Sequence, residues 1–271
     1  MKMTLAIAFI GGGNMAQAMG RGIVTAKGSG ETIYVMDRNP ETLEKWQGWG
    51  ATTGLAPSAT LSECKVWILA VKPQNLKEVC ESIKPYLKAD TLIISVAAGI
   101  SMASMQQWLG HERIIRTMPN TPALVGMGMT GMFASSVVSG EDIALAEETL
   151  SYMGGVVKVD QESLIDAVTA LSGSGPAYIY LFIESLIAGA TKMGLTEEQA
   201  KQMAVATVAG AAKMVETTGE TPAKLRENVS SKGGTTLAAL GVFYERGLPK
   251  IVEDAMVAAA RRAGELSKEL G

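Results

Sequence analysis

The sequence predicts an α/β protein: an N-terminal Rossmann-like, doubly wound, mainly parallel sheet followed by an all-helical C-terminal domain. Two observations predict it. Up to about Lys158, short β-branched runs alternate with helical patterns, which is typical of a parallel sheet covered by helices. After Asp160 the strand-like runs stop and amphipathic segments follow one another. The predicted domains are therefore residues 1–160, a dinucleotide-binding fold, and residues 161–271, a helical domain.

The predicted strands are LAIAFI, TIYVMD, KVWILAV, TLIISVA, RIIRTM and MTGMFA. The first belongs to the apolar start MTLAIAFI, which could be mistaken for a signal peptide. It runs directly into glycines that suit a turn from a strand to a helix, so we interpret it as a strand.

Helix boundaries in the second half are marked by local signals. Thr196 and Gln199 are expected to form a capping box. Gly194 and Gly247 are expected to end helices, and Pro222 and Pro249 to lie in the first turn of helices. The segment AVATVAGAAKM is crowded with Ala and Gly, which are either good helix formers or a surface for close packing with another subunit. The scarcity of bulky side chains from Thr196 to Thr217 predicts a homodimer.

Composition excludes several classes of protein. The net charge of -3, without a dense run of Lys or Arg, argues against nucleic-acid binding. Cys64 and Cys80 lack metal-type spacing and are too few for a disulfide framework, so we expect no metal site and a cytoplasmic location. The longest apolar stretch, 177–190, is broken by Glu184 and is shorter than the ~20 residues that span a bilayer, so we expect no membrane association.

The segment FIGGGNMAQA carries the first candidate site. Gly11, Gly13 and Ala16 fit the G-x-G-x-x-G/A pattern between a predicted strand and a predicted helix. Gly11 would permit the tight turn, Gly13 would let the backbone approach a pyrophosphate, and Ala16 would let the helix lie close to the strand. An ordinary glycine turn is the alternative, and the strand and helix on either side disfavour it.

The second strand ends in MDRNP, which gives two conflicting signals about the cofactor. Asp37, 21 residues beyond Ala16, is the kind of residue that binds a ribose diol. The adjacent Arg38 is the kind that accommodates a 2′-phosphate. A solvated turn would also explain both residues, so these residues alone leave the cofactor open.

Two further segments, AVKP (70–73) and SVAAGI (95–100), each close a predicted parallel strand, at the edge where open sheets of this class bind ligands. Lys72 precedes a helix opened by Pro73 and is either a surface lysine or a contact to ribose or phosphate. His111 follows the helix-ending Gly110, so we expect a loop residue and not a catalyst.

Two segments of the second half suggest anion binding. In SSKGGTT (230–236), glycines and threonines at a helix start expose backbone N–H donors, unless they form a plain N-cap without a ligand. The stretch from Ser172 to Gly175 precedes Pro176, which we expect at the start of another helix. Two such helix starts would converge on one substrate.

The sequence resembles pyrroline-5-carboxylate reductase from the first strand to the last helices. The segments that carry the resemblance are FIGGGNMAQA, AVKP, SVAAGI, RTMPNTPALVGMGMT, DAVTALSGSGPAYIY and GGTT. The resemblance implies a C-terminal dimerisation domain, homodimers that can form larger oligomers, and reduction of the cyclic imine to L-proline with NADPH, with NADH also used. It departs from the family at Lys232, where a proline is usual, which would loosen the turn.

The resemblance also implies residue roles. The residues it assigns to the cofactor are Gly11, Gly13, Asn14, Met15, Ala70, Val71, Lys72, Pro73, Ala97, Ala98, Gly99 and Asn228, beside Asp37 and Arg38. It assigns Glu162, Thr235 and Thr236 to the substrate. We expect the backbone at Gly233, Gly234 and Thr235 to bind the substrate carboxylate and Thr236 to be the catalytic hydroxyl at the ring nitrogen, with Ser174 the next hydroxyl in line.

Two alternative functions stay open. One is a beta-hydroxyacid dehydrogenase, since that family is similar in its two-domain plan. Its members place a lysine soon after a glycine-rich helix start, whereas here no lysine follows Gly175 before Lys192. A nucleotide-sensing subunit without catalytic activity would keep the glycine loop but need no second anion site.

Overall fold

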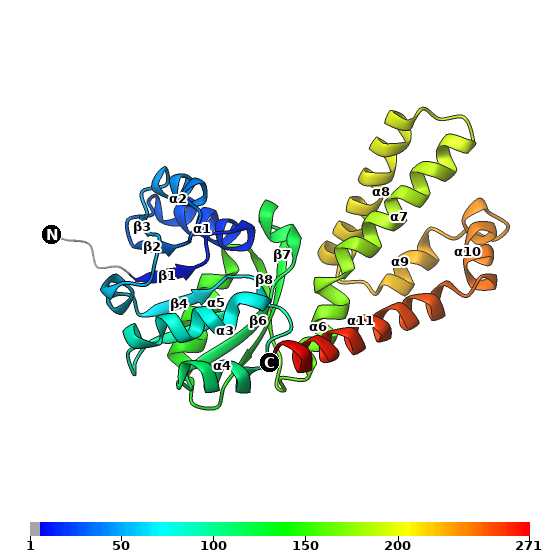
Figure 1. Cartoon of the computed structure of the whole chain (residues 1–271). Coiled ribbons are helices and arrows are strands. Elements are labelled where there is room, and N and C mark those ends of the chain that lie inside the picture. Colours follow the sequence, from blue (N-terminus) through cyan, green and yellow to red (C-terminus); the bar gives the residue numbers. More distant parts are fainter. Residues whose placement is uncertain (1–5) are drawn as a thin grey trace. The chain divides into compact units, whose positions relative to one another are not determined.

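The structure, a computed structural model, describes residues 6–271, so the start of the predicted first strand, residues 3–5, lies outside it (Figure 1). The chain forms two compact units. One extends to Ser174 and includes Ala258–Gly271, and the other is Gly175–Val257. Residues 161–174 and 258–271, assigned to the helical domain from the sequence, thus pack with the sheet.

The first unit is built on a single sheet of eight strands within the described residues, in the order β3-β2-β1-β4-β5-β6-β7-β8. The strands are β1 (Ile7–Ile10), β2 (Ile33–Met36), β3 (Thr52–Gly54), β4 (Val66–Leu69), β5 (Leu92–Ser95), β6 (Ile114–Met118), β7 (Gly128–Ala134) and β8 (Gly154–Lys158). Every neighbouring pair is parallel except β6 with β7, which is antiparallel. The predicted mainly parallel, doubly wound sheet is confirmed.

The six predicted runs match β1, β2, β4, β5, β6 and β7, whereas β3 and β8 were not predicted. Both are edge strands. β3 has three residues, and β8 opens with two glycines and is largely exposed. Edge strands of this kind lack the continuous apolar run that identifies a central parallel strand.

Helices cover both faces of the sheet, as Figure 1 shows. One core cluster joins the sheet to α1 (Asn14–Lys27), α2 (Pro40–Gln47) and α5 (Gly140–Ser151). The other joins it to α3 (Pro73–Ile83) and α4 (Met102–Leu109). Short 3-10 turns occupy Ala59–Glu63, Lys84–Tyr86 and Thr121–Val125. This arrangement leaves the carboxyl ends of β1, β2, β4 and β5 side by side at one edge.

The chain leaves the sheet through α6 (Leu164–Val168) and a π-helical turn at Thr169–Gly173, which continue into α7 (Gly175–Lys192). Pro176 lies in the first turn of α7, as predicted, but the predicted open helix start at Ser172 to Gly175 is wrong. The backbone before α7 is already helical, and Ser174 N–H donates to Thr169 O at 2.8 Å. Gly173 serves packing, because a Cβ at this position would lie 2.6 Å from Met118 Cε. π-Helical turns are frequent at functional sites.

The second unit consists of α7, α8 (Glu197–Thr218), α9 (Pro222–Asn228), α10 (Thr235–Glu245) and the first part of α11 (Leu248–Leu270). The predicted helix signals are confirmed. Thr196 and Gln199 form a reciprocal capping box, Gly194 and Gly247 lie between helices, and Pro222 opens α9. Within residues 6–271 no helix is both long enough and apolar enough to cross a bilayer.

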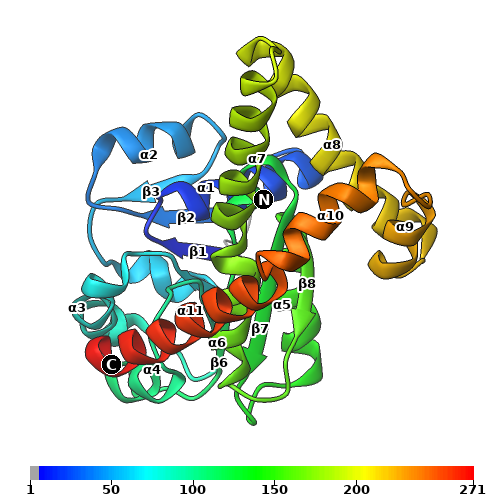
Figure 2. The ribbon, with the colours of Figure 1, turned by 90° about the vertical axis from the view of Figure 1, so that its right-hand side faces the viewer.

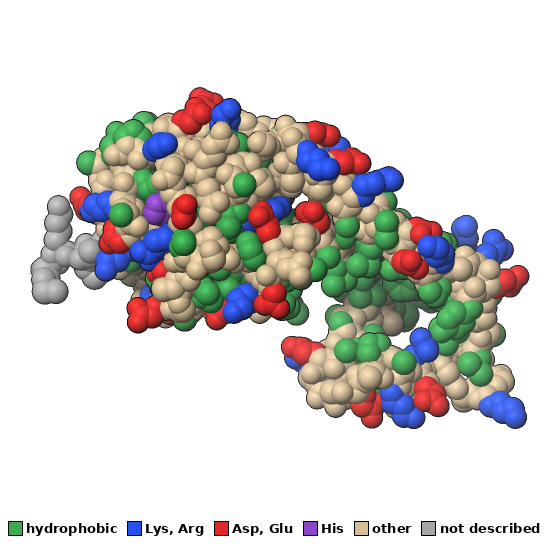
Figure 3. Space-filling view, turned by 90° about the horizontal axis from the view of Figure 1, so that it is seen from below, with side chains coloured by type: hydrophobic (Ala, Val, Ile, Leu, Met, Phe, Trp, Pro, Cys, Tyr) green, Lys and Arg blue, Asp and Glu red, His purple; other side chains and the backbone are tan. Residues whose placement is uncertain are grey.

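The second unit exposes much apolar surface. Tyr180, Leu181, Met203, Val242 and Ile251 are among the large apolar side chains that lie open on it. Green side chains gather over this unit on the right of Figure 3. Exposed apolar side chains gathered in this way are typical of a protein interface.

Candidate functional site

The turn between β1 and α1 has the geometry expected of a dinucleotide cradle. Gly11 has a φ of 96°, and a Cβ at this position would lie 2.7 Å from the carbonyl oxygen of Ala70. A Cβ at Gly13 would meet no atom of residues 6–271 within 4 Å. The turn therefore needs glycine at 11 for its own backbone and leaves position 13 open to a ligand.

The N-terminus of α1 is free to bind an anion. Gly13 is its N-cap, and no side chain of the described residues caps it. Asn14 and Met15 form the first turn, where backbone N–H groups and the positive end of the helix dipole face outward. Ala16 is 1% exposed and lets the helix lie against the sheet. A pyrophosphate fits such a terminus.

The middle glycine of the loop is fixed by three side chains. Gly12 N–H donates to Asp37 Oδ2 at 2.7 Å. Gly12 O accepts from Trp46 Nε1 at 3.1 Å and from Gln17 Nε2 at 2.8 Å. The cradle is thus pre-organised before any ligand binds. The roles of Trp46 and Gln17 were not predicted, because nothing in the sequence pattern places them beside the loop.

Beside the loop lies a cavity of about 400 Å³. It brings together half of the predicted cofactor residues, namely Gly11, Gly13, Asp37, Arg38, Ala70, Val71 and Lys72. Arg38 and Lys72 are exposed, whereas Asp37 uses both carboxylate oxygens on backbone N–H groups, those of Gly12 and of Asn39. Pro73 opens α3 at the edge of this cavity.

The loop after β5 carries Ala97, Ala98 and Gly99 and is fastened at both ends. At its start, Thr117 Oγ1 donates to Ser95 O at 2.8 Å. At its end, Met102 N–H, the first amide of α4, donates to Glu162 Oε1 at 2.7 Å. Gly99 also lies against α11, since a Cβ there would be 3.2 Å from Leu266 Cβ. Figure 2 shows this end of α11 beside α4.

Glu162 belongs to a charge cluster at the end of β6. Arg116, 5% exposed, donates from Nη1 to Glu162 Oε1 at 2.7 Å and lies 4.0 Å from Asp166 Oδ1. Burial raises the pKa of Asp166 above its usual value, the Arg116 charge opposes this, and the Glu162 charge adds to it. Arg116 is a residue that the sequence analysis missed, since an arginine inside an apolar strand run gave no functional signal.

Asn120 is a second missed residue. Its Nδ2 donates to Ser172 O at 3.2 Å and to Ser172 Oγ at 3.1 Å, and its Oδ1 accepts from Met129 N–H at 2.9 Å. Asn120 thus ties the loop after β6 to the π-helical turn, next to Ser174. The asparagine of this proline-containing loop supplies three of the bonds that hold it.

In the second unit, the start of α10 forms the other candidate site. Gly234 N–H donates to Ser231 O at 2.9 Å and Gly233 has a φ of 75°, the pattern of a type II turn with Lys232 at the position where proline is favoured. No side chain among residues 6–271 caps α10. The N–H groups of Thr235 and Thr236 are thereby left at an open helix start, while Thr236 itself is half-buried.

Asn228 ends α9 and donates from Nδ2 to Glu220 Oε2 at 3.2 Å. It lies in the same unit as the α10 start. The predicted site residues therefore fall into two groups. One is on the sheet unit, including Glu162 and Ser174, and the other is on the helical unit at positions 228 and 233–236.

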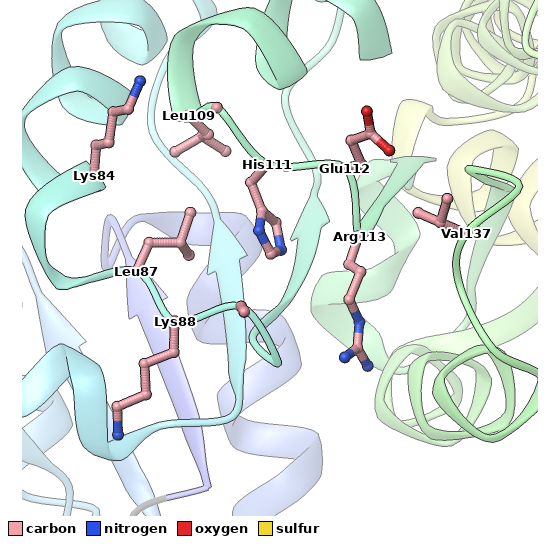
Figure 4. Close-up of a pocket in the computed structure, with 10 residues that line it drawn as sticks. Lys84, Leu87, Lys88, Leu109, His111, Glu112, Arg113 and Val137 are labelled. Atoms are coloured by element: carbon pink, nitrogen blue, oxygen red, sulfur yellow. The ribbon is translucent and has the colours of Figure 1, made fainter.

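Two other features carry no site. A cavity of about 510 Å³ lies at the amino ends of β5 and β6, but in Figure 4 the charged groups of Lys84, Lys88 and Arg113 point in different directions around His111. His111 lies in a loop, as predicted, with Nε2 2.8 Å from Thr91 O.

The two cysteines also form no candidate site. Burial raises the pKa of the Cys64 and Cys80 thiols to about 12, which leaves them unreactive. The described part of the chain has no cluster of three or more His, Cys, Asp or Glu side chains suited to a metal.

The fold and the β1–α1 cradle define a two-unit dinucleotide-binding protein of the Rossmann class. Residues 6–99 match the family model described as NADP oxidoreductase coenzyme F420-dependent, and residues 162–266 match pyrroline-5-carboxylate reductase dimerisation. The chain belongs to the pyrroline-5-carboxylate reductase family.

Relatives and solved structures match over nearly the full length. The pyrroline-5-carboxylate reductase of Pseudomonas aeruginosa is 40% identical over 267 residues, 98% of each chain. The structure of a pyrroline-5-carboxylate reductase from Coxiella burnetii is 39% identical, with a TM-score of 0.93 over 98% of this chain and 99% of that one. The Plasmodium falciparum pyrroline carboxylate reductase with NADP bound is 29% identical, with a TM-score of 0.84 over 97% and 98%.

Proposed function

We propose that the protein reduces 1-pyrroline-5-carboxylate to L-proline with NADPH, the last step of proline biosynthesis. The observation that carries the proposal is the 40% identity to a pyrroline-5-carboxylate reductase over 98% of both chains. The geometry supports it, because one chain holds a dinucleotide cradle and a separate open helix start suited to a carboxylate.

The residues of the first unit fit a dinucleotide. Gly13 leaves room for a pyrophosphate, and the uncapped start of α1 offers its N–H groups at Asn14 and Met15. The cavity beside it, with Ala70, Val71 and Lys72 on its wall, would take the ribose, next to Pro73 at the start of α3. Ala97 to Gly99, in the loop after the neighbouring strand β5, would lie against the nicotinamide, and Asn228 would contact the cofactor as the residue of the helical unit that the resemblance assigns to it.

The chemistry needs positioning and a donor at nitrogen. When bound, reduced nicotinamide supplies a hydride to the imine carbon, and the ring nitrogen keeps the proton that makes the imine electrophilic. The N–H groups at Gly233, Gly234 and Thr235 would bind the substrate carboxylate. Thr236 would hydrogen-bond the ring nitrogen, with Glu162 and Ser174 as further substrate contacts. Glu162 has a second oxygen, Oε2, available for this purpose.

The decisive experiment is an assay of the purified protein for oxidation of NADPH. Oxidation that depends on added 1-pyrroline-5-carboxylate and yields proline supports the proposal. Oxidation of NADPH that depends instead on the carbonyl form of a 3-hydroxyacid, which is reduced to the hydroxyacid, would assign a beta-hydroxyacid dehydrogenase. Binding of NADPH without turnover of either substrate would indicate a nucleotide-sensing subunit.

For the cofactor, we expect Arg38→Ala to raise the KM for NADPH about tenfold and to leave the KM for NADH nearly unchanged, since it removes one charged hydrogen bond to the 2′-phosphate. A preference for NADPH is supported by Asp37, because both of its carboxylate oxygens already accept hydrogen bonds from backbone N–H groups and a ribose diol would have to share them. Steady-state kinetics with both cofactors measures this. Arg21→Ala, an exposed arginine on α1 that does not line the cavity, is the control. Equal losses with both cofactors would contradict the assignment.

For assembly, we expect an obligate homodimer through the helical unit, which can build larger oligomers. The exposed apolar side chains of α7, α8, α10 and α11 support it. Sedimentation at assay concentration should show no active, stable monomer, and finding one would exclude the dimer. We also propose a cytoplasmic location, which two buried, unpaired cysteines support.

A further inference from the structure

We propose that Arg116 is a positioning residue for the reaction, one that holds the loop 96–101 in place through Glu162. The inference rests on the proposed function, in which this loop lies against the nicotinamide. The observation behind it is a continuous chain of contacts from a buried arginine to the first amide of α4.

The loop spans two fixed points. It leaves β5 at Ser95, whose register partner in β6 is Arg116. It enters α4 at Met102, whose N–H is one of the four at a helix start that cannot bond within the helix. The N-cap Ser101 satisfies the amide of Ser104, so Met102 depends on another acceptor. That acceptor is Glu162 Oε1.

A single oxygen accepts both bonds, since Glu162 Oε1 takes the Met102 N–H and the Arg116 Nη1–H, each at 2.7 Å. Glu162 is partly exposed, with 30% of its side chain accessible, so without a partner its carboxylate could turn toward water. Arg116 is almost fully buried and approaches from β6, on the same face of the sheet as α4. It therefore fixes where the carboxylate, and with it the start of α4, can lie.

Asp166 does not replace Glu162 in this role. It lies 4.0 Å from Arg116, beyond direct hydrogen-bond distance. Its pKa is raised by burial, which disfavours its charged form and weakens it as a partner. The charge of Arg116 is thus directed mainly at Glu162, and through it at the loop.

The chain offers a matched control three residues away. Arg113 precedes β6, at its amino end, and its guanidinium forms an ion pair with Asp142 of α5. Both arginines pair with a carboxylate from a neighbouring element, but Arg113 lies at the opposite end of β6 from the loop. Replacing it tests the loss of an ion pair without the loss of the loop anchor.

The experiment compares Arg116→Met and Arg116→Lys with Arg113→Met. The first readout is amide hydrogen exchange of the segment 96–105 without cofactor. We expect Arg116→Met to speed exchange at the Met102 amide and across the loop, Arg116→Lys to do so less, and Arg113→Met to leave it unchanged. Glu162→Gln, which keeps a carbonyl oxygen as acceptor, should retain more protection than Glu162→Ala.

The second readout is the kinetic split. We expect kcat to fall roughly 10- to 100-fold in Arg116→Met, because a shift of the loop misplaces the nicotinamide, with partial rescue in Arg116→Lys. The dissociation constant of NADPH, measured by its fluorescence, should hardly change, because the pyrophosphate cradle is intact. If Arg116→Met does not fold, amide hydrogen exchange of Arg116→Lys, Glu162→Gln and Glu162→Ala tests the proposal instead.

The outcomes separate the two proposals. Unchanged loop exchange in the Arg116 variants, or losses of kcat no larger than in Arg113→Met, overturns the positioning role even if the wild type reduces the imine. A different outcome is loop exchange that is faster in the Arg116 variants than in the wild type while the wild type itself reduces no imine. That outcome would overturn the proposed function and leave the anchoring of the loop supported.

Discussion

Replacing Thr236 with alanine should lower turnover by about 10²-fold or more, while the affinity for NADPH hardly changes. The variant removes one preorganised donor at the ring nitrogen, which matters most in the transition state. Thr236 is the second residue of α10, half-buried, and its Oγ1 bonds to no other group of residues 6–271, so the hydroxyl is available to a ligand. Stopped-flow single-turnover kinetics would isolate the chemical step.

Two companion variants sharpen this test. Thr236→Ser keeps the hydroxyl and should retain far more activity than alanine, since only the methyl group that restricts the rotamer is lost. Thr235→Ala is the matched control one position earlier, where the proposed contact is the backbone N–H, and its effect should be mild. Normal turnover in both alanine variants would place the donor elsewhere, with Ser174 the next residue to replace.

Replacing Gly11 with alanine should weaken NADPH binding about tenfold or more. A residue with a side chain at a φ of 96° costs on the order of 1–2 kcal/mol, and here the added Cβ would also lie 2.7 Å from Ala70 O, so the loop must move. The displaced loop no longer presents the first turn of α1 to the pyrophosphate. Titration of NADPH fluorescence measures the change.

Gly28 provides the control. It ends α1 with a φ of 79°, but a Cβ there would meet no atom of the described chain within 4 Å. Gly28→Ala should therefore lower the thermal midpoint through backbone strain alone and leave NADPH affinity intact. A Gly11→Ala protein that binds NADPH as tightly as the Gly28→Ala protein would show that the loop is not the cradle.

Some features could not be read from the sequence because they depend on which segments meet. Arg116 is one arginine in an apolar run until Glu162, 46 residues later, is seen to accept hydrogen bonds from its Nη1–H and from the Met102 N–H together. Asp37 and Arg38 give conflicting signals about the cofactor, and only the structure shows that the Asp37 oxygens accept from Gly12 and Asn39. The stretch at Ser172 resembled an open helix start, but α6 and the π-helical turn precede α7 without a break.

By itself the sequence determined the alternation of strands and helices, the glycine turn after β1, the capping box at Thr196 and the open start of α10, because each depends on backbone preferences of a few neighbouring residues. The tertiary structure alone decided three features. These are the addition of β3 and β8 at the two edges of the sheet, the return of residues 258–271 to the sheet unit, and the anchoring of the loop 96–101 by Arg116 and Glu162. These features join residues far apart in the chain. Their free energy comes from burial and from hydrogen bonds that exist only once the segments pack together, and no local pattern encodes it.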